Sequence, residues 1–207
     1  MNIKKTANLL LNFAIKRLAE IFGILISLTG AMLFLALITY SPNDPNFIFP
    51  ENTKIENLMG FQGSFVSDLF FQSVGLISYL IPFTLIFTGI NILNTKDFFL
   101  FIENNFFTIL YLIFGSLFFA YYYSDTYALY INGNSGFVGD YLGQTFLKSI
   151  ILINESIFFY TLILIIIILF LISINFSLRN FLISIKKILQ FFDKDGNKNY
   201  TDKSEII

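Results

Sequence analysis

Four long runs of apolar residues, none containing a charge, constrain this chain more than any other feature of its sequence. They cover residues 21–40, 73–93, 105–123 and 156–176. A helix of about 20 mostly apolar residues is long enough to cross the hydrocarbon core of a membrane. Backbone polar groups in hydrocarbon must be hydrogen-bonded within the segment, so each run is predicted to be a helix and not an open strand. We therefore predict an all-α integral membrane protein, a bundle of four transmembrane helices surrounded by lipid.

The composition argues against most soluble and catalytic classes of protein. Only 13% of the 207 residues are charged, about half the usual share in a soluble domain. The chain has no His and no Cys, which removes imidazole and thiolate metal ligands, disulfides and His-based proton relays. The phosphate-binding, serine-hydrolase and zinc-protease motifs are also missing from the sequence. We expect no catalytic residue, no metal and no cofactor, and hence no enzyme.

The first apolar run has basic residues before it, as a secretory signal peptide does. Its 20 residues exceed the usual apolar stretch of about 7–15, and no small-x-small cleavage site follows. We predict that it stays in place as the first membrane span, with a cleaved signal peptide as the alternative.

Basic residues are concentrated at the two ends of the chain. Of the 13 Lys and Arg residues, four precede the first run and six follow the fourth. Loops rich in Lys and Arg stay in the cytoplasm, and four spans place both ends on one side. Both termini are therefore predicted to be cytoplasmic, and the loops 41–72 and 124–155 to face outward.

The chain is predicted to divide into three segments. Residues 1–20 form a cytoplasmic N-terminal segment with a weak amphipathic pattern, 21–192 form the membrane domain, and 193–207 begin a polar cytoplasmic linker or tail. Within the membrane domain, apolar residues over 178–192 recur at helical spacing, and Arg179, Lys186 and Lys187 lie on the other face. This pattern favours a helix in the membrane interface, and a plain extension of the fourth span is the alternative.

Both outward loops are rich in turn-forming residues. Pro42 and Pro45 flank Asp44 at the exit of the first span, a combination typical of a rigid turn. The second loop holds four glycines within residues 133–143, but it lacks the Lys-Ser/Thr and the preceding strand of a phosphate-binding loop. There we expect a turn and a short helix over 137–147, packed closely on the bundle. Pro82 lies inside the second run, where it is expected to kink or pack that helix.

Four stretches form an ordered set of motifs. They are YSPNDP at 40–45, NLMGFQGSFVSD at 57–68, LFFQSVGLISYLIP at 69–82 and SGFVGDYL at 135–142. In order and spacing they resemble S-Y-S-P-x-D-P-S, N-x-x-G-x-x-G-A-x-x-A-D, L-x-x-x-F-G-x-x-A-Y-x-x-P and G-G-x-x-G-x-x-L of FtsK/SpoIIIE-type DNA translocases. The resemblance covers roughly residues 15–187, the four-span N-terminal region of that family. Ser64 and Ser67 stand where the family usually has Ala.

The resemblance implies a membrane anchor in the bacterial inner membrane. Such an anchor holds a translocase at the division septum for chromosome segregation, assembles with itself and contacts other cell-division membrane proteins. In the family, hexameric motor domains pump chromosomal DNA through the closing septum. The sequence contains no Walker motif and no DNA-reading winged helix, so we expect DNA as a partner only indirectly. We expect the chain to be the leading segment of a longer machine. A stand-alone protein, a fragment and one half of a split translocase all stay open, as does the oligomer number.

The motif residues are the candidate sites of contact with protein partners. They are Tyr40, Pro42, Asp44, Pro45, Gly60, Gly63, Asp68, Gly75, Tyr79, Pro82, Gly136 and Gly139. The alternative function is a small channel or transporter subunit, although the uncharged spans offer no proton or ion route. A membrane-embedded enzyme would need a carboxylate pair, and nothing in the spacing brings the outward carboxylates together.

Overall fold

The computed structural model describes residues 3–45, 54–123, 133–145, 154–177 and 186. This described part consists of helices and connecting segments without a strand, which confirms the predicted all-α class. Four helical segments are long and apolar enough to cross a membrane, namely Ala7–Ile38, Gly60–Thr95, Phe99–Tyr122 and Glu155–Ser173. The helices belong to one compact unit, Met1–Asn175. The predicted interfacial helix and tail, residues 178–207, lie outside the described residues except for Lys186.

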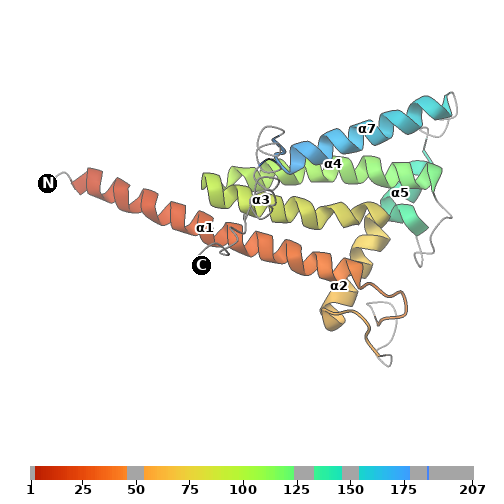
Figure 1. Cartoon of the computed structure of the whole chain (residues 1–207), viewed down its shortest axis with the longest axis horizontal. Coiled ribbons are helices and arrows are strands. Elements are labelled where there is room, and N and C mark those ends of the chain that lie inside the picture. The colour runs from red at the N-terminus through yellow and green to blue at the C-terminus, as the bar shows by residue number, and fades with distance from the viewer. Residues whose placement is uncertain (1–2, 46–53, 124–132, 146–153, 178–185, 187–207) are drawn as a thin grey trace, which may run out of the picture. The chain divides into compact units, whose positions relative to one another are not determined.

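Helix α1 is one continuous helix, Ile3–Ile38, with no break between the predicted cytoplasmic segment and the first span. It ends just before Ser41, because the residue preceding a proline is disfavoured in the helical conformation. At about 1.5 Å per residue, the part from Glu20 to Ile38 spans nearly the roughly 30 Å of a hydrocarbon core. The N-terminal part of α1 continues past the ends of α3 and α4 (Figure 1).

The second predicted span is interrupted near its start. Helix α2, Gly60–Val74, is followed by the 3-10 helix η1, Gly75–Leu80, and then by α3, Ile81–Thr95. Gly75 has φ 73°, a left-handed conformation that turns the chain at little steric cost only in glycine. Helix α2 consequently runs across one end of the bundle instead of extending α3 (Figure 1). Pro82 lies in the first turn of α3, where proline is tolerated, so it begins a helix and does not kink one.

The remaining helices are α4, Phe99–Tyr122, the short 3-10 helix η2, Gly133–Ser135, then α5, Gly136–Gly143, and α7, Glu155–Ser173. Helix α5 covers the first part of the short helix expected over 137–147. Helix α7 begins after Asn154, whose side chain accepts a hydrogen bond from the Ile157 N–H at 3.3 Å, a standard N-cap arrangement.

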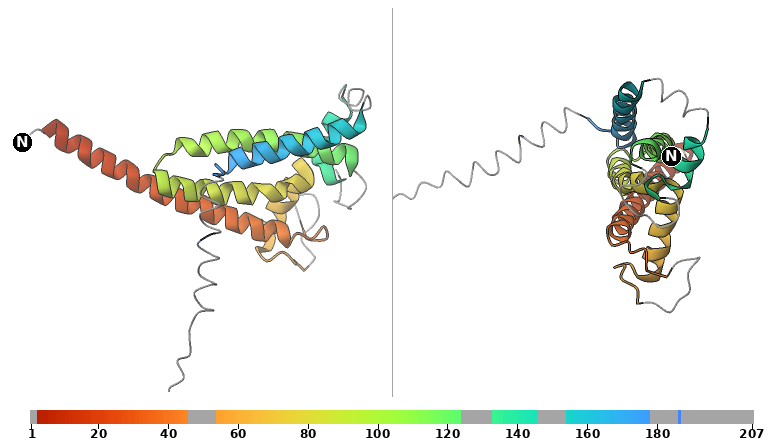
Figure 2. Two further views of the ribbon diagram at one scale, coloured as in Figure 1. Left: turned by 45° about the horizontal axis from the view of Figure 1, so that its top comes forward. Right: turned by 90° about the vertical axis from the view of Figure 1, so that its right-hand side faces the viewer.

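Helices α1, α3, α4 and α7 pack side by side in this order. Helix α1 contacts α3, α3 contacts α4, and α4 contacts α7, an order that is visible along the bundle in Figure 2. The approach of α1 to α3 is close, since a Cβ atom on Gly23 would lie 2.8 Å from the Gly89 carbonyl oxygen. Small residues of this kind allow helix backbones to approach each other in membranes.

The bundle has two distinct ends. The loop end carries the C-terminus of α1, helices α2 and α5, and the N-terminus of α7, and the turn end carries the short connection between α3 and α4. At the turn end, Glu20 of α1 pairs with Lys96 at 2.9 Å and with Arg17 at 2.6 Å. The Glu20–Lys96 pair ties α1 to the α3–α4 turn, whereas the Glu20–Arg17 pair lies within α1.

Candidate functional site at the loop end

Asp44 connects the turn after α1 with the segment before α2. Its carboxylate accepts hydrogen bonds from the backbone N–H groups of Glu56 at 2.8 Å and Asn57 at 2.9 Å. The residue is only 2% exposed, so these bonds satisfy a buried charge and two backbone donors together. Next to it, the Pro45 carbonyl accepts from the Ser64 hydroxyl of α2 at 3.0 Å. The turn predicted from the prolines is thus attached both to the segment before α2 and to α2 itself.

Asn57 attaches the same segment to the end of α1. Its amide donates to the Ala36 carbonyl at 2.8 Å, and its Oδ1 accepts from the Met59 N–H at 3.0 Å. The Ala36 carbonyl lies in the last turn of α1, where helix carbonyls lack intrahelical partners. Asn57 stands in a recognised motif, yet its role depends on a residue 21 positions away and does not follow from local spacing.

Tyr40 and Asp68 form the centre of the loop end. The Tyr40 hydroxyl donates to Asp68 Oδ1 at 3.0 Å, and the Tyr40 ring lies 4.7 Å from that of Phe71. Phe71 in turn contacts Tyr79 at 5.2 Å between ring centroids, and the Tyr79 hydroxyl donates to the Leu37 carbonyl at 3.5 Å. Burial, together with the neighbouring Asp68 carboxylate, raises the pKa of Tyr40 above its usual value, so the neutral phenol is the form that this site holds.

A second cluster joins α5 to η1 through glycines. Gly75 and Gly136 both have positive φ, 73° and 65°, and a Cβ on Gly136 would lie 2.5 Å from the Gly75 nitrogen. A Cβ on Gly139 would lie 2.5 Å from the Ser116 carbonyl oxygen. The Ser116 hydroxyl donates to the Val74 carbonyl at 2.8 Å, which fixes the last residue of α2 on α4.

The other candidate residues have different surroundings. Gly60 begins α2 with φ 65°, and a Cβ there would meet no atom within 4 Å. Gly63 is buried, and a Cβ there would collide with the Asn57 side chain. Pro42 is partly buried and Pro82 is buried in α3. Most of the motif residues therefore hold the loop end together from inside.

Inside the spans, polar side chains link α3, α4 and α7, which the sequence pattern did not predict. The Thr84 hydroxyl lies 3.1 Å from the Tyr111 hydroxyl of α4 and 3.1 Å from the Ser173 hydroxyl of α7. Asn104 of α4 donates to the Thr88 hydroxyl at 2.8 Å and accepts from the Asn175 amide at 2.7 Å. Hydropathy averages over such residues, so only their meeting in space reveals the network.

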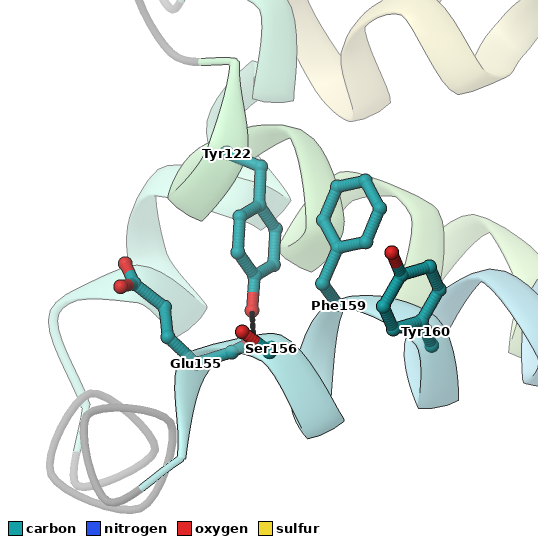
Figure 3. Close-up of a pocket in the computed structure, with 5 residues that line it drawn as sticks. All are labelled: Tyr122, Glu155, Ser156, Phe159 and Tyr160. Atoms are coloured by element: carbon teal, nitrogen blue, oxygen red, sulfur yellow. Dashed lines mark hydrogen bonds between the residues drawn. The ribbon is translucent and has the colours of Figure 1, made fainter.

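A small aromatic pocket lies between the ends of α4 and α7 (Figure 3). It encloses about 250 Å³ and is lined by Tyr122, Glu155, Ser156, Phe159 and Tyr160. The Tyr122 hydroxyl donates to the Glu155 carbonyl at 2.9 Å, and the Glu155 carboxylate points away from the rings of Phe159 and Tyr160 (Figure 3). The arrangement joins the end of α4 to the start of α7 and does not form an acid–base pair.

The carboxylates of the loop end have separate partners. Asp44 holds backbone N–H groups, Asp68 holds Tyr40, and Asp140 accepts from the Ser135 hydroxyl at 2.6 Å. Within the described ranges, no three His, Cys, Asp or Glu side chains come together in a group that suits a metal ion. Each of the three carboxylates therefore holds a neighbouring backbone or hydroxyl group of the loop end.

Comparison with known proteins gives matches that agree with this geometry. Residues 15–186 match the 4TM region of DNA translocase FtsK/SpoIIIE. The chain is 37% identical over 83 residues to a DNA translocase FtsK of Vibrio vulnificus, covering 40% of this chain and 8% of that protein. It is 32% identical over 79 residues to a DNA translocase FtsK of Caulobacter vibrioides, covering 38% of this chain and 10% of that protein. No solved structure matches the chain.

Proposed function

The chain belongs to the 4TM-region family of the DNA translocases FtsK/SpoIIIE, and from this premise we propose that it anchors a translocase at the division septum. The chain is a multi-pass protein of the inner membrane and spans about a tenth or less of the length of the relatives that it matches. The region that matches is the membrane region and not a motor. Its proposed contribution is therefore attachment and placement, while a motor outside this region moves the DNA.

The observation that carries the proposal is the convergence of motif residues at the loop end. Tyr40 and Asp44 follow α1, whereas Asp68 lies in α2, and hydrogen bonds join the two segments. A surface that is already held in one arrangement binds a partner at a lower cost in conformational entropy. The buried motif residues supply that fixed arrangement, and the exposed side chains around them supply the contact surface.

The contact surface that we propose is the outer face of α2 and the turn before it. Leu58, Phe61 and Leu69 are exposed there, next to the buried Gly63, Ser64 and Asp68 of the same segment. Aromatic side chains such as Phe61 are enriched in protein interfaces, whose buried core is apolar. The proposed partners are other division proteins of the membrane and further copies of this chain.

Charge supports a cytoplasmic turn end and an outward loop end. Lys16, Arg17 and Lys96 lie at the turn end, where the ion pairs with Glu20 mark the edge of the bundle. The excess of Lys and Arg belongs on the cytoplasmic side. In this orientation both termini are cytoplasmic, and the proposed contact surface faces away from the cytoplasm.

A localisation experiment tests the proposal. A fluorescent fusion of the full chain is expected to concentrate at midcell in dividing cells. The Phe61→Ser and Leu69→Ser double variant changes only exposed positions of α2, so it should keep membrane insertion and lose the midcell band. A matched Leu164→Ser variant on the exposed face of α7 should keep the band. Uniform membrane fluorescence of the unmodified fusion would contradict the proposed septal role.

The channel alternative receives little support from the spans. The polar groups named above in α3, α4 and α7 bond to one another, as in a packed helix interface. Solute flux through liposomes that contain the purified chain would be the measurement favouring that alternative.

A further inference from the structure

An apolar groove lies between α4 and α5, and none of the candidate contact residues of the loop end lines it. It has a volume of about 460 Å³ and is lined only by apolar surface. The lining side chains come from α2, α4 and α5 and are Val74, Ile109, Leu112, Ile113, Phe137, Val138, Tyr141 and Leu142.

The groove is built into the fold, because α5 is fixed on both sides of it. Gly136 and Gly139 bring the backbone of α5 against η1 and α4, and the Tyr121 hydroxyl of α4 donates to the Gly143 carbonyl at 2.9 Å. These contacts seat the start, middle and end of α5, which lies beside the last part of α4 (Figure 2). The backbone of α5 is therefore fixed beside α4, and the groove between the two helices does not depend on the rotamer of a single side chain.

The groove is continuous with the surface that faces lipid. Ile109 is 58% exposed on α4, one of the membrane-spanning segments, and Ile102 and Phe106 continue the same exposed face toward the turn end. On the other wall, Phe137 and Tyr141 are exposed and stack at 6.3 Å between ring centroids. Aromatic side chains of this type are enriched where a membrane protein meets the lipid interface.

We propose that this groove binds one acyl chain of a membrane phospholipid. An ordered water molecule would not be stable in the groove, since a buried water needs two to four polar partners and the lining offers none. An empty groove would forfeit the dispersion contacts of its walls. A hydrocarbon chain is the apolar group that surrounds α4 on its exposed face, and it enters the groove sideways without crossing a polar barrier.

The absence of Trp from the chain allows a direct test. The full chain carrying Ile109→Trp has one Trp at the rim of the groove, and the full chain carrying Leu164→Trp has one on the exposed lipid-facing surface of α7. Each is purified in detergent and titrated with a phospholipid brominated in its acyl chain, which quenches Trp fluorescence on contact. The groove Trp is expected to be quenched saturably by about one lipid per chain, at a lipid concentration about tenfold lower than the control Trp requires.

Two further measurements keep the result clear. Val138→Phe in the Ile109→Trp background fills the groove and should remove the saturable step, while the elution volume and helix content stay unchanged. Native mass spectrometry of the unmodified chain should retain one phospholipid after washing in detergent. Equal, non-saturating quenching of both Trp residues would mean bulk lipid contact only and would overturn the proposal. Quenching that vanishes as the chain dimerises would assign the groove to a second copy and would also overturn it.

Discussion

Gly75 and Gly136 lie backbone to backbone where α2, η1 and α5 meet, and each adopts a positive φ. A Cβ on Gly136 would lie 2.5 Å from the Gly75 nitrogen and 2.6 Å from the Val74 nitrogen. No side chain fits between these segments, so two glycines from distant parts of the sequence set the position of α5. The proposed lipid groove depends on that junction, because its walls are formed by Val74 of α2 and by side chains of α4 and α5.

Gly75→Ala is expected to destabilise the chain much more than Gly60→Ala. Both glycines have positive φ, 73° and 65°, and a residue with a Cβ in such a sparsely populated backbone region costs of order 1–3 kcal/mol. At Gly75 the new methyl would also collide with the Asn134 carbonyl, whereas at Gly60 it meets no atom within 4 Å. Thermal unfolding in detergent, followed by the loss of the monodisperse chromatography peak, compares the two variants. Equal midpoints would show that the contact at Gly75 is unimportant.

Asp44→Ala is expected to lower the free energy of unfolding by about 2–4 kcal/mol, because the buried N–H of Asn57 and the part-buried N–H of Glu56 lose their acceptor. Asp44→Asn should cost less, since the amide oxygen still accepts one of these bonds. Glu103→Gln, an exposed carboxylate on α4, is the control and should leave stability nearly unchanged. Denaturant titration in mixed micelles gives the three values. A neutral effect of Asp44→Ala would mean that the loop end is not held by this residue.

The sequence predicted the spans well because apolar length is visible without knowledge of contacts. It did not predict the break at Gly75, since the apolar run passes through it and hydropathy carries no information about φ. The continuity of α1 was missed for a related reason, because charges such as Arg17 and Glu20 end a hydrophobic run without ending a helix. The motif stretches placed Tyr40 and Asp68 in one set of candidates, but the hydrogen bond between them follows only from the three-dimensional structure. Their role as contacts with partner proteins stays a prediction.

Thr88 and Asn104 are expected to be energetically coupled across α3 and α4. Each is replaced by an apolar residue of similar size, Thr88→Val and Asn104→Leu, alone and together, so that the cycle isolates their 2.8 Å hydrogen bond. Hydrogen bonds between membrane helices contribute about 0.6 kcal/mol on average and up to ~1.7, and we expect a coupling in that range. Asn104→Leu alone should cost more than Thr88→Val alone, because it also removes the acceptor for Asn175.

The control for this cycle combines Thr88→Val with Thr161→Val. Thr161 is exposed on α7 and bonds its own helix through the Ile157 carbonyl, so the two effects should add. The free energies of unfolding of all variants are measured in the same detergent. A coupling for Thr88 and Asn104 no larger than that of the control pair would contradict the proposed contact.

The stability that Tyr40 contributes is expected to disappear at high pH. Burial and the Asp68 carboxylate raise the pKa of Tyr40 above its reference value of 10.0 in the folded chain. The folded state therefore keeps the phenolic proton at pH values where the unfolded chain has lost it. The contribution is fully present below pH 10 and is lost as pH rises above that value toward the folded pKa. We expect the unfolding midpoint of the wild type, measured relative to Tyr40→Phe in detergent, to be constant between about pH 8 and 9 and to fall above about pH 10.

Asp68→Asn keeps the burial and removes the neighbouring charge, so its decline relative to an Asp68→Asn/Tyr40→Phe double variant should be shallower. Parallel curves for the wild type and Tyr40→Phe above pH 10 would show that Tyr40 is not held as the neutral phenol at the loop end.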